Sequence, residues 1–422
     1  MDRTNFKDHM SLKLKDVFTP GGIPSITYVD REELQLEDKI RNALIRGFAI
    51  NVVTGATKSG KSVLCHRVLG ERKLITVEGG QVQSEEEFWT HVAHQLSLAS
   101  EATKSASTGE KIGVEAGGGW KLGFDFSAKA KAESSSETVT QVTYSNVLKL
   151  ACIDALIENG AALLVDDFHY IDSATQKKII QGIKGPVMRG LAVFLLAVPH
   201  RAFDPMTVEN EVEGRFKHIP IPPWELNDLK KIPKTGFAAL NFDVSEDVQA
   251  RICEESFGNP LLVQEACSEF AIANGCIEKG LTKKQLDSSK LDDAFAEMAT
   301  SKGFPKYQKL KKGPQARKAR QVRQMRDGQG EDIYAAIMKS IARTGPKPLI
   351  TYDEIRASLK DLMGDSKALP QKNEITSALN HMTAIAKKEI KGEPPLEWIK
   401  DKDELVITDP FLLFYMKHAL NV

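Results

Sequence analysis

Apolar runs alternate with amphipathic segments over the first half of the chain. The runs at 48–53, 161–165 and 192–198 have the length and β-branched content of buried strands. Helical spacing of apolar residues is found at 31–47, 62–69, 144–159 and 173–185. Strands that alternate with helices form mostly parallel sheets. The pattern therefore predicts an α/β core over 30–223.

The second half of the chain is dominated by helical patterns. Residues 224–300 have helical spacing and no further strong strand, which predicts a helical domain. Within 330–422, three helical patterns at 331–343, 352–363 and 371–389 precede strand-like pieces at 396–399 and 405–407. Three helices followed by a β-ribbon are typical of a winged helix-turn-helix. A last helix is expected after Asp409-Pro410.

Two segments interrupt this order. Residues 1–29 read as a polar lead-in that ends in an extended stretch at 25–29. Residues 105–140 combine glycines and serines with alternating apolar positions, which predicts an inserted β-hairpin or flap. Two interpretations of this insertion stay open, a solvated loop or a place of contact between subunits.

The composition excludes wholesale disorder, collagen-like structure and a small scaffold held together by disulfides. Hydrophobic residues make up 41% and charged residues 27% of 422 residues, and Lys+Arg and Asp+Glu are both 57, so the net charge is zero. The five cysteines are scattered singly, which favours reduced, buried thiols over disulfides or zinc. The first residues lack an apolar core and no window of 18 residues is uninterruptedly apolar. We therefore expect no signal peptide, no membrane span and a cytoplasmic location.

The neutral sum hides a basic tract over 302–326, which holds ten Lys/Arg and no acid. The tract, within a linker at 301–329, suits either contact with a nucleic-acid backbone or a solvated surface. The candidate recognition helix at 371–388 carries Lys372, Asn373, Asn380 and His381 together with Glu374. This mixed face does not decide between reading DNA and a structural role.

The strongest chemical signal is the phosphate loop Gly55-Ala56-Thr57-Lys58-Ser59-Gly60-Lys61-Ser62, which follows a predicted strand and precedes a predicted helix. Backbone N–H groups of such a loop surround phosphate oxygens at a helix N-terminus. We expect Lys61 to neutralise the β- and γ-phosphates and Ser62 to bind Mg²⁺. The nucleotide-binding residues predicted here are Gly55, Lys58, Ser59, Gly60, Lys61, Ser62 and Val63.

A second half of this site is expected where the strand at 161–165 ends in Asp166-Asp167. Asp166 is predicted to bind Mg²⁺, and Asp167 to orient or deprotonate the attacking water. An alternative for Asp167 is a helix N-cap at the strand end.

Two arginines are candidates for contact with the γ-phosphate. Arg201 follows the strand at 192–198, at the edge where parallel strands deliver a nucleotide site. Arg215 could complete the site of a neighbouring subunit as an arginine finger. Each arginine could equally form an ordinary surface ion pair. His169 and His200 have no metal-like partners and are expected to pack or to form hydrogen bonds.

The segments GATKSGKS, LLVDDFHYID, FLLAVPHR and SFGNPLL, in this order, resemble a P-loop ATPase of the AAA+/STAND grouping. The likeness is to prokaryotic ATPases of the archaeal and origin-recognition type, with a helical lid at 224–300 and a C-terminal winged helix. It implies that Arg31, in an entry motif at 28–33, and Pro260, in Gly258-Asn259-Pro260-Leu261, contact the adenine base. It also implies that Arg201 is a sensor arginine.

Departures from the family refine this expectation. No sensor arginine follows Pro260, which favours STAND-like switching, and Asp167 replaces a common glutamate, which implies slow hydrolysis. The resemblance thus implies an oligomerising switch that uses ATP and Mg²⁺, controls a separate effector protein and belongs to anti-phage defence. Two alternatives stay open: a DNA-associated AAA+ loader or transposition regulator, and a scaffold that holds ATP without turnover.

Overall fold

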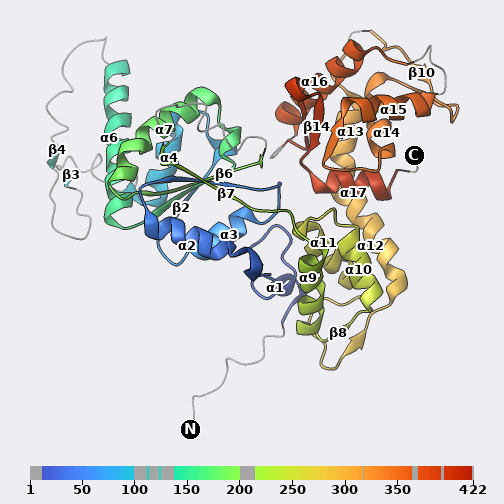
Figure 1. Ribbon diagram of the computed structural model, residues 1–422, viewed down its shortest axis with the longest axis horizontal. Helices are drawn as coiled ribbons and strands as arrows, with labels where there is room; N and C mark the ends of the chain where they lie inside the picture. The colour runs from blue at the N-terminus through green and yellow to red at the C-terminus, as the bar shows by residue number, and fades with distance from the viewer. Residues whose placement is uncertain are drawn as a thin grey trace. The chain divides into compact units, whose positions relative to one another are not determined.

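A computed structural model describes residues 12–98, 112–113, 123–124, 137–199, 214–316, 318–363, 369–390 and 394–420 (Figure 1). The chain forms two compact units. The first, here called the sheet unit, comprises Arg31–Ala56 and Gly60–Pro222. The second, the helical unit, comprises Met1–Asp30, Thr57–Ser59 and Pro223–Val422.

The sheet unit is built on five parallel strands, which confirms the expected α/β class. They lie in the order β2-β5-β6-β1-β7. Their bounds are β1 Ile50–Thr54, β2 Leu74–Glu78, β5 Ala162–Asp166, β6 Ala192–Ala197 and β7 Phe216–Pro220. The three inner strands are those that the apolar runs predict. The outer strands β2 and β7 were not predicted, because each has one exposed face and therefore no continuous apolar run.

Helices cover both faces of this sheet (Figure 1). Leu164 packs in a core cluster with residues of α2 and α3, whereas its neighbours Leu163 and Val165 pack with residues of α4, α6 and α7. This alternation follows from the two-residue period of a strand. The helices of the unit are α2 Leu36–Arg46, α3 Lys61–Leu69, α4 Glu85–Gln95, α6 Glu137–Glu158 and α7 Ser173–Met188, with 3₁₀ turns η1 Glu32–Leu34, η2 Gly79–Gln81 and η3 Phe168–Tyr170.

The predicted hairpin in the glycine-rich insertion is represented by two short strands. Strand β3 (Ile112–Gly113) pairs antiparallel with β4 (Gly123–Phe124). From 137 onward the insertion is the start of α6. Its other residues lie outside the part of the chain that the structure describes.

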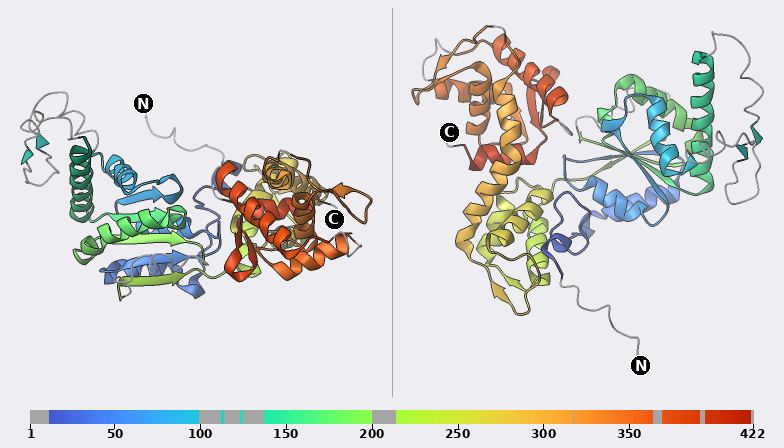
Figure 2. Two further views of the ribbon diagram at one scale, coloured as in Figure 1. Left: turned by 90° about the horizontal axis from the view of Figure 1, so that it is seen from above. Right: turned by 180° about the vertical axis from the view of Figure 1, so that it is seen from behind.

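The helical unit begins with α1 (Leu14–Val17). Its further helices are α9 Leu226–Ala239, α10 Glu246–Glu254, α11 Pro260–Ala273, α12 Leu291–Met298, α13 Phe304–Lys312, α14 Ile333–Arg343, α15 Tyr352–Met363, α16 Lys372–Glu389 and α17 Pro410–His418, with η6 Ser288–Lys290, the π-helix η7 Ala299–Gly303 and η8 Lys400–Lys402. Helices α12, η7 and α13 follow one another without a break, and α13 packs with α14, α16 and α17 (Figure 2).

Short strands complete the helical unit. Strand β12 (Leu349–Thr351) and strand β13 (Leu396–Ile399) flank β14 (Glu404–Ile407) in an antiparallel sheet. Two further pairs are β8 Phe242–Asp243 with β9 Lys284–Gln285, and β10 Arg323–Gln324 with β11 Gly330–Glu331. All three helices, the two strand pieces and the last helix expected over 330–422 are present. Strand β12 was not predicted, because it has only three residues.

The N-terminal segment differs from the polar lead-in that its sequence suggests. Val17 and Phe18 are buried in the core of the helical unit. The stretch expected to be extended contains Thr27, whose hydroxyl donates to the Val17 carbonyl at 2.7 Å and accepts from Gln264 Nε2 at 2.8 Å. This stretch forms bends and turns and no strand. Together with Leu14, the residues Val17 and Phe18 pack the N-terminal segment into the core although many of its other residues are charged.

Two expectations from composition can be checked directly. All five cysteines are buried and unpaired with one another, as predicted. In the part of the chain that the structure describes, no helix combines the length and the apolar character that crossing a membrane requires.

The packing of Phe18 leads to a stability prediction. Its ring meets Phe237 edge-on at 5.0 Å between centroids, and a side chain at Gly236 would collide with it. Phe18→Ala should therefore lower the free energy of unfolding of the helical unit by about 3–5 kcal/mol, measured by denaturant titration with hydrogen exchange in α9. Phe304→Ala, at a position 40% exposed, is the control and should cost less than half as much. Equal losses would contradict a core role for Phe18.

Candidate nucleotide-binding site

The phosphate loop joins the end of β1 to the start of α3. Every residue of β1 is buried, so the strand holds the start of the loop firmly. Gly60 is the N-cap of α3 with a φ of 91°, a left-handed conformation that favours glycine. A Cβ built on Gly60 would meet no atom within 4 Å, so there is open space in front of the first turn of α3. Such a space at a helix N-terminus suits an anion.

Lys61 opens the helix and is 6% exposed. Its ammonium donates hydrogen bonds to the carbonyls of Gly55 at 3.0 Å and Ala56 at 2.9 Å. The side chain therefore curls back along the loop, which places its positive charge beside the start of the loop.

The Ser62 hydroxyl donates a hydrogen bond of 2.5 Å to Asp166 Oδ2. Asp166 ends β5, which is separated from β1 by β6, so the two residues meet because parallel strands end at one edge of the sheet. The other carboxylate oxygen, Oδ1, accepts from the Asp167 amide at 2.9 Å. A hydroxyl and a carboxylate are the oxygen donors that Mg²⁺ prefers. The predicted metal pair is therefore assembled in the structure, and its chemistry fits the ion.

Asp167 has a left-handed backbone, with φ 50° and ψ 39°. It is the N-cap residue of η3, but its side chain makes no capping hydrogen bond. The backbone of Gly79 packs against this turn, since a Cβ at Gly79 would collide with the Asp167 carbonyl and lie 2.9 Å from that of Asp166. The ends of β2 and β5 are thus held together by close backbone contact.

Glu78, the last residue of β2, was missed in the sequence. It pairs in register with Asp166. Partial burial raises the pKa of the Glu78 carboxyl, and the negative charge of Asp166 raises it further. The only sequence signal would have been an acid before Gly79-Gly80, and it becomes meaningful only once 74–78 is known to be a strand.

Arg31 is buried although it is charged, being 5% exposed. Its guanidinium donates from Nη1 and Nη2 to the Pro222 carbonyl at 3.1 and 3.0 Å. Arg31 thereby ties the beginning of the sheet unit to its end.

Pro260 is the first residue of α11, in the helical unit. Asn259 caps this helix by accepting from the Leu261 amide at 3.0 Å, and its Nδ2 donates to the Thr57 carbonyl at 3.2 Å. Trp224 Nε1 donates to the Ser59 carbonyl at 2.8 Å. Both acceptors belong to the loop segment that groups with the helical unit. Trp224 and Asn259 were not among the predicted site residues.

Lys58 lies in the same loop segment and has a φ of 57°. Its ammonium is 3.4 Å from Asp409 Oδ2, and Lys306 also pairs with this carboxylate. Asp409 is 4% exposed and caps α17 by accepting from the Leu412 amide. Burial alone would raise the pKa of Asp409, but the two lysines outweigh it and hold that pKa below its usual value.

Of the two candidate arginines, the structure describes only Arg215, and it does not bring this residue to the loop. Arg215 directly precedes β7, whose first residue Phe216 pairs with Ile50 at the start of β1. Because the loop follows the other end of β1, Arg215 lies at the opposite edge of the sheet. Arg201, like His200, lies outside the residues that the structure describes.

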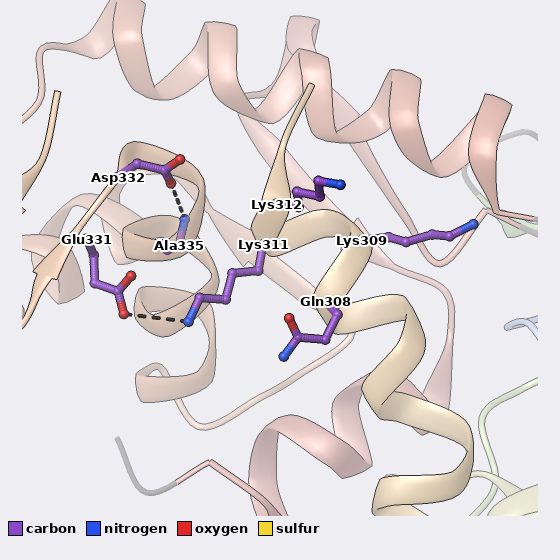
Figure 3. A pocket seen from close by; sticks show the side chains of 7 residues that line it. All are labelled: Gln308, Lys309, Lys311, Lys312, Glu331, Asp332 and Ala335. Carbon is purple, nitrogen blue, oxygen red and sulfur yellow. Dashed lines mark hydrogen bonds and ion pairs between the residues drawn. The ribbon is translucent and has the colours of Figure 1, made fainter. Parts of the chain in front are cut away.

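The basic tract is partly neutralised within the helical unit, where five of its ten cations form ion pairs. Its cations pair with acids that are distant in sequence: Lys302 with Glu265, Lys306 with Asp409, Lys311 with Glu331, Arg320 with Asp332 and Arg323 with Glu374. An open pocket of about 430 Å³ lies beside α13 (Figure 3). Lys311 reaches toward Glu331, whereas the side chains of Lys309 and Lys312 point away from the two acids, and the lining of the pocket has mixed charge.

The strand order of the parallel sheet and the loop after β1 are consistent with the α/β fold of P-loop AAA+ ATPases. No protein-family model and no curated protein matches the chain. Among solved structures, the Walker-type ATPase paby2304 of Pyrococcus abyssi is similar over 92% of this chain and 96% of that chain, with 15% identity and a TM-score of 0.51. At this identity the likeness shows the fold alone.

Two further solved structures cover nearly the whole chain at lower scores. Cdc6p from Pyrobaculum aerophilum is 14% identical over 97% of this chain and 98% of its own, with a TM-score of 0.44. The ORC2 protein of Aeropyrum pernix, in ADPNP–ADP complexes, is 14% identical over 95% and 96%, with a TM-score of 0.47.

The geometry of Lys61 predicts the effect of its removal. Lys61→Ala should abolish ATP binding, because the loop would lose its only buried ammonium among the described residues. Titration with a fluorescent ATP analogue measures this. Lys177→Ala, an exposed position on α7, removes the same charge and should bind like the wild type. If Lys61→Ala kept the wild-type affinity, the loop would not be a phosphate site.

Proposed function

We propose that the chain is a Mg²⁺-dependent ATPase that hydrolyses ATP slowly to ADP and phosphate and acts as an oligomerising switch. The observation that carries this proposal is the 2.5 Å hydrogen bond between Ser62 and Asp166, beside the buried Lys61. It joins two residues, 104 positions apart, that belong to the two halves of the predicted nucleotide site. The fold shared with a Walker-type ATPase supports the same conclusion.

The residues divide the work as follows. Loop N–H groups from Gly55 to Val63 and the Lys61 ammonium hold the phosphates. Ser62 and Asp166 hold Mg²⁺, which when bound neutralises charge on the β- and γ-phosphate oxygens. Asp167 orients the attacking water. The resemblance described above supports Lys58 and Ser59 as further loop contacts, and Arg31 and Pro260 as residues that contact the base.

The position of Arg215 supports the proposed oligomerisation. At the edge of the sheet opposite the loop, this arginine is suited to the site of a neighbouring copy and not to its own. Arg201 is retained as the sensor of the γ-phosphate on the strength of the resemblance. The same resemblance supports control of a separate effector protein in anti-phage defence, and with it a cytoplasmic location.

A second candidate function is DNA association through the C-terminal part of the helical unit. The order α14, β12, α15, α16, β13, β14 supports a winged helix. The exposed side of α16 carries Asn373, Ser377, Asn380 and Lys388, which suit base and phosphate contacts. The ion pairs of the basic tract argue against 302–326 as the main contact surface. Stimulation of hydrolysis by duplex DNA, falling steeply with salt, would favour this function.

A substitution at Asp167 distinguishes a switch that hydrolyses ATP from a scaffold that only binds it. Asp167→Asn should keep ATP affinity but slow hydrolysis by about 10²-fold, because the amide is a poorer acceptor for the attacking water. Chromatography of the bound nucleotide should then find ATP where the wild type holds ADP. If the wild type and the variant both retained ATP and neither hydrolysed it, the result would indicate a scaffold that holds ATP without turnover.

Assembly can be measured by mass photometry with Mg²⁺ and either ADP or a slowly hydrolysed ATP analogue. The switch should grow into one defined oligomer only with the analogue. Mixing Arg215→Ala with Lys61→Ala subunits should restore part of the ATPase activity, because each variant supplies what the other lacks. No recovery above the separate variants would count against action of Arg215 on a neighbour.

A further inference from the structure

Glu78 and Asp166 end neighbouring strands side by side. The two residues are register partners in the parallel pair β2–β5. Neighbouring strands lie about 5 Å apart, and paired residues of a parallel sheet point to the same face. The Asp166 carboxylate reaches Ser62 on α3, so Glu78 projects from the face of the sheet that α3 covers.

The packing of the strands supports this orientation. Leu164 and Leu74 share the alternation of Asp166 and Glu78, and both pack in the core cluster that holds α2 and α3. Leu163 and Val165 lie in the cluster of the opposite face. Asp167 is two residues after Val165 and would lie on the same face in a regular strand. Its left-handed backbone, however, ends the strand geometry at this residue. The regular alternation of the strands therefore places Glu78 on the same face of the sheet as the predicted metal pair, Ser62 and Asp166.

The position of Glu78 is fixed by the backbone that follows it. Gly79 is buried against the carbonyls of Asp166 and Asp167, with no room for a side chain. The turns η2 and η3 pack on each other at this point. Glu78 as a residue is exposed, although its carboxyl is partly buried, so the side chain is accessible to solvent at the end of β2.

We propose that Glu78 is a second acid that orients the attacking water, acting together with Asp167. This inference rests on the proposed ATPase function. In the reaction, the water oxygen forms a bond to the γ-phosphorus while the bond from that phosphorus to the bridging oxygen breaks. ADP leaves with the bridging oxygen and its electron pair. One proton of the water stays on inorganic phosphate, and the other passes to solvent. Glu78 accepts a hydrogen bond from this water as it attacks.

The test compares Glu78→Gln with Glu86→Gln, a matched change at an exposed position on α4. Three quantities are measured for each variant and the wild type: affinity for an ATP analogue, retention of ADP with aluminium fluoride, and the Mg²⁺ concentration for half-maximal binding. Aluminium fluoride with ADP imitates the γ-phosphoryl group during attack, so its retention depends on an ordered water and requires no turnover.

Glu78→Gln should bind the ATP analogue like the wild type, with an unchanged Mg²⁺ requirement. It should retain ADP–aluminium fluoride at least tenfold more weakly and turn over about 10²-fold more slowly. Retention equal to that of Glu86→Gln, or a change in the Mg²⁺ requirement alone, would overturn the proposal. A wild type that binds no ATP would overturn the proposed function itself, which is a distinguishable result.

Discussion

The hydrogen bond between Ser62 and Asp166 depends on the order and the common direction of the strands in the parallel sheet. Strands β1 and β5 are not neighbours, and β6 between them sets their distance. Because all five strands run in one direction, the loop after β1 and the acids after β5 reach the same edge. The same edge of the sheet also holds the buried Lys61, the turn at Asp167 and the packing of Gly79 against that turn.

Much of this arrangement is predictable from the sequence, for a clear physical reason. The inner strands are buried on both faces and so appear as apolar runs, and the loop has a fixed spacing of glycines, lysine and serine. The edge strands lack such a run, and Glu78 was missed with β2. Trp224 and Asn259 were missed for another reason: each donates to a carbonyl of the loop, and any residue type offers a carbonyl.

A count of charges along the basic tract does not include the acids, distant in sequence, with which its cations pair in the fold. Ten cations without an acid suggest a surface for polyanions. In the fold, however, Arg323 is 6% exposed and meets Glu374, which is 51 residues away, at 2.7 Å. Glu265 and Asp409 are almost fully buried and require cations to offset the cost of desolvation. Half of the cations in the tract therefore pair with buried or distant acids of its own unit.

The burial of every cysteine has a practical consequence. Cys65 and Cys152 belong to the sheet unit, and Cys253, Cys267 and Cys276 to the helical unit. Burial raises the pKa of the Cys152 and Cys253 thiols to about 12, so the reactive thiolate is scarce at neutral pH. An alkylating reagent would thus modify each thiol only when its own unit opens. Mass spectrometry of the modified peptides would follow the opening of the two units separately in the unaltered protein.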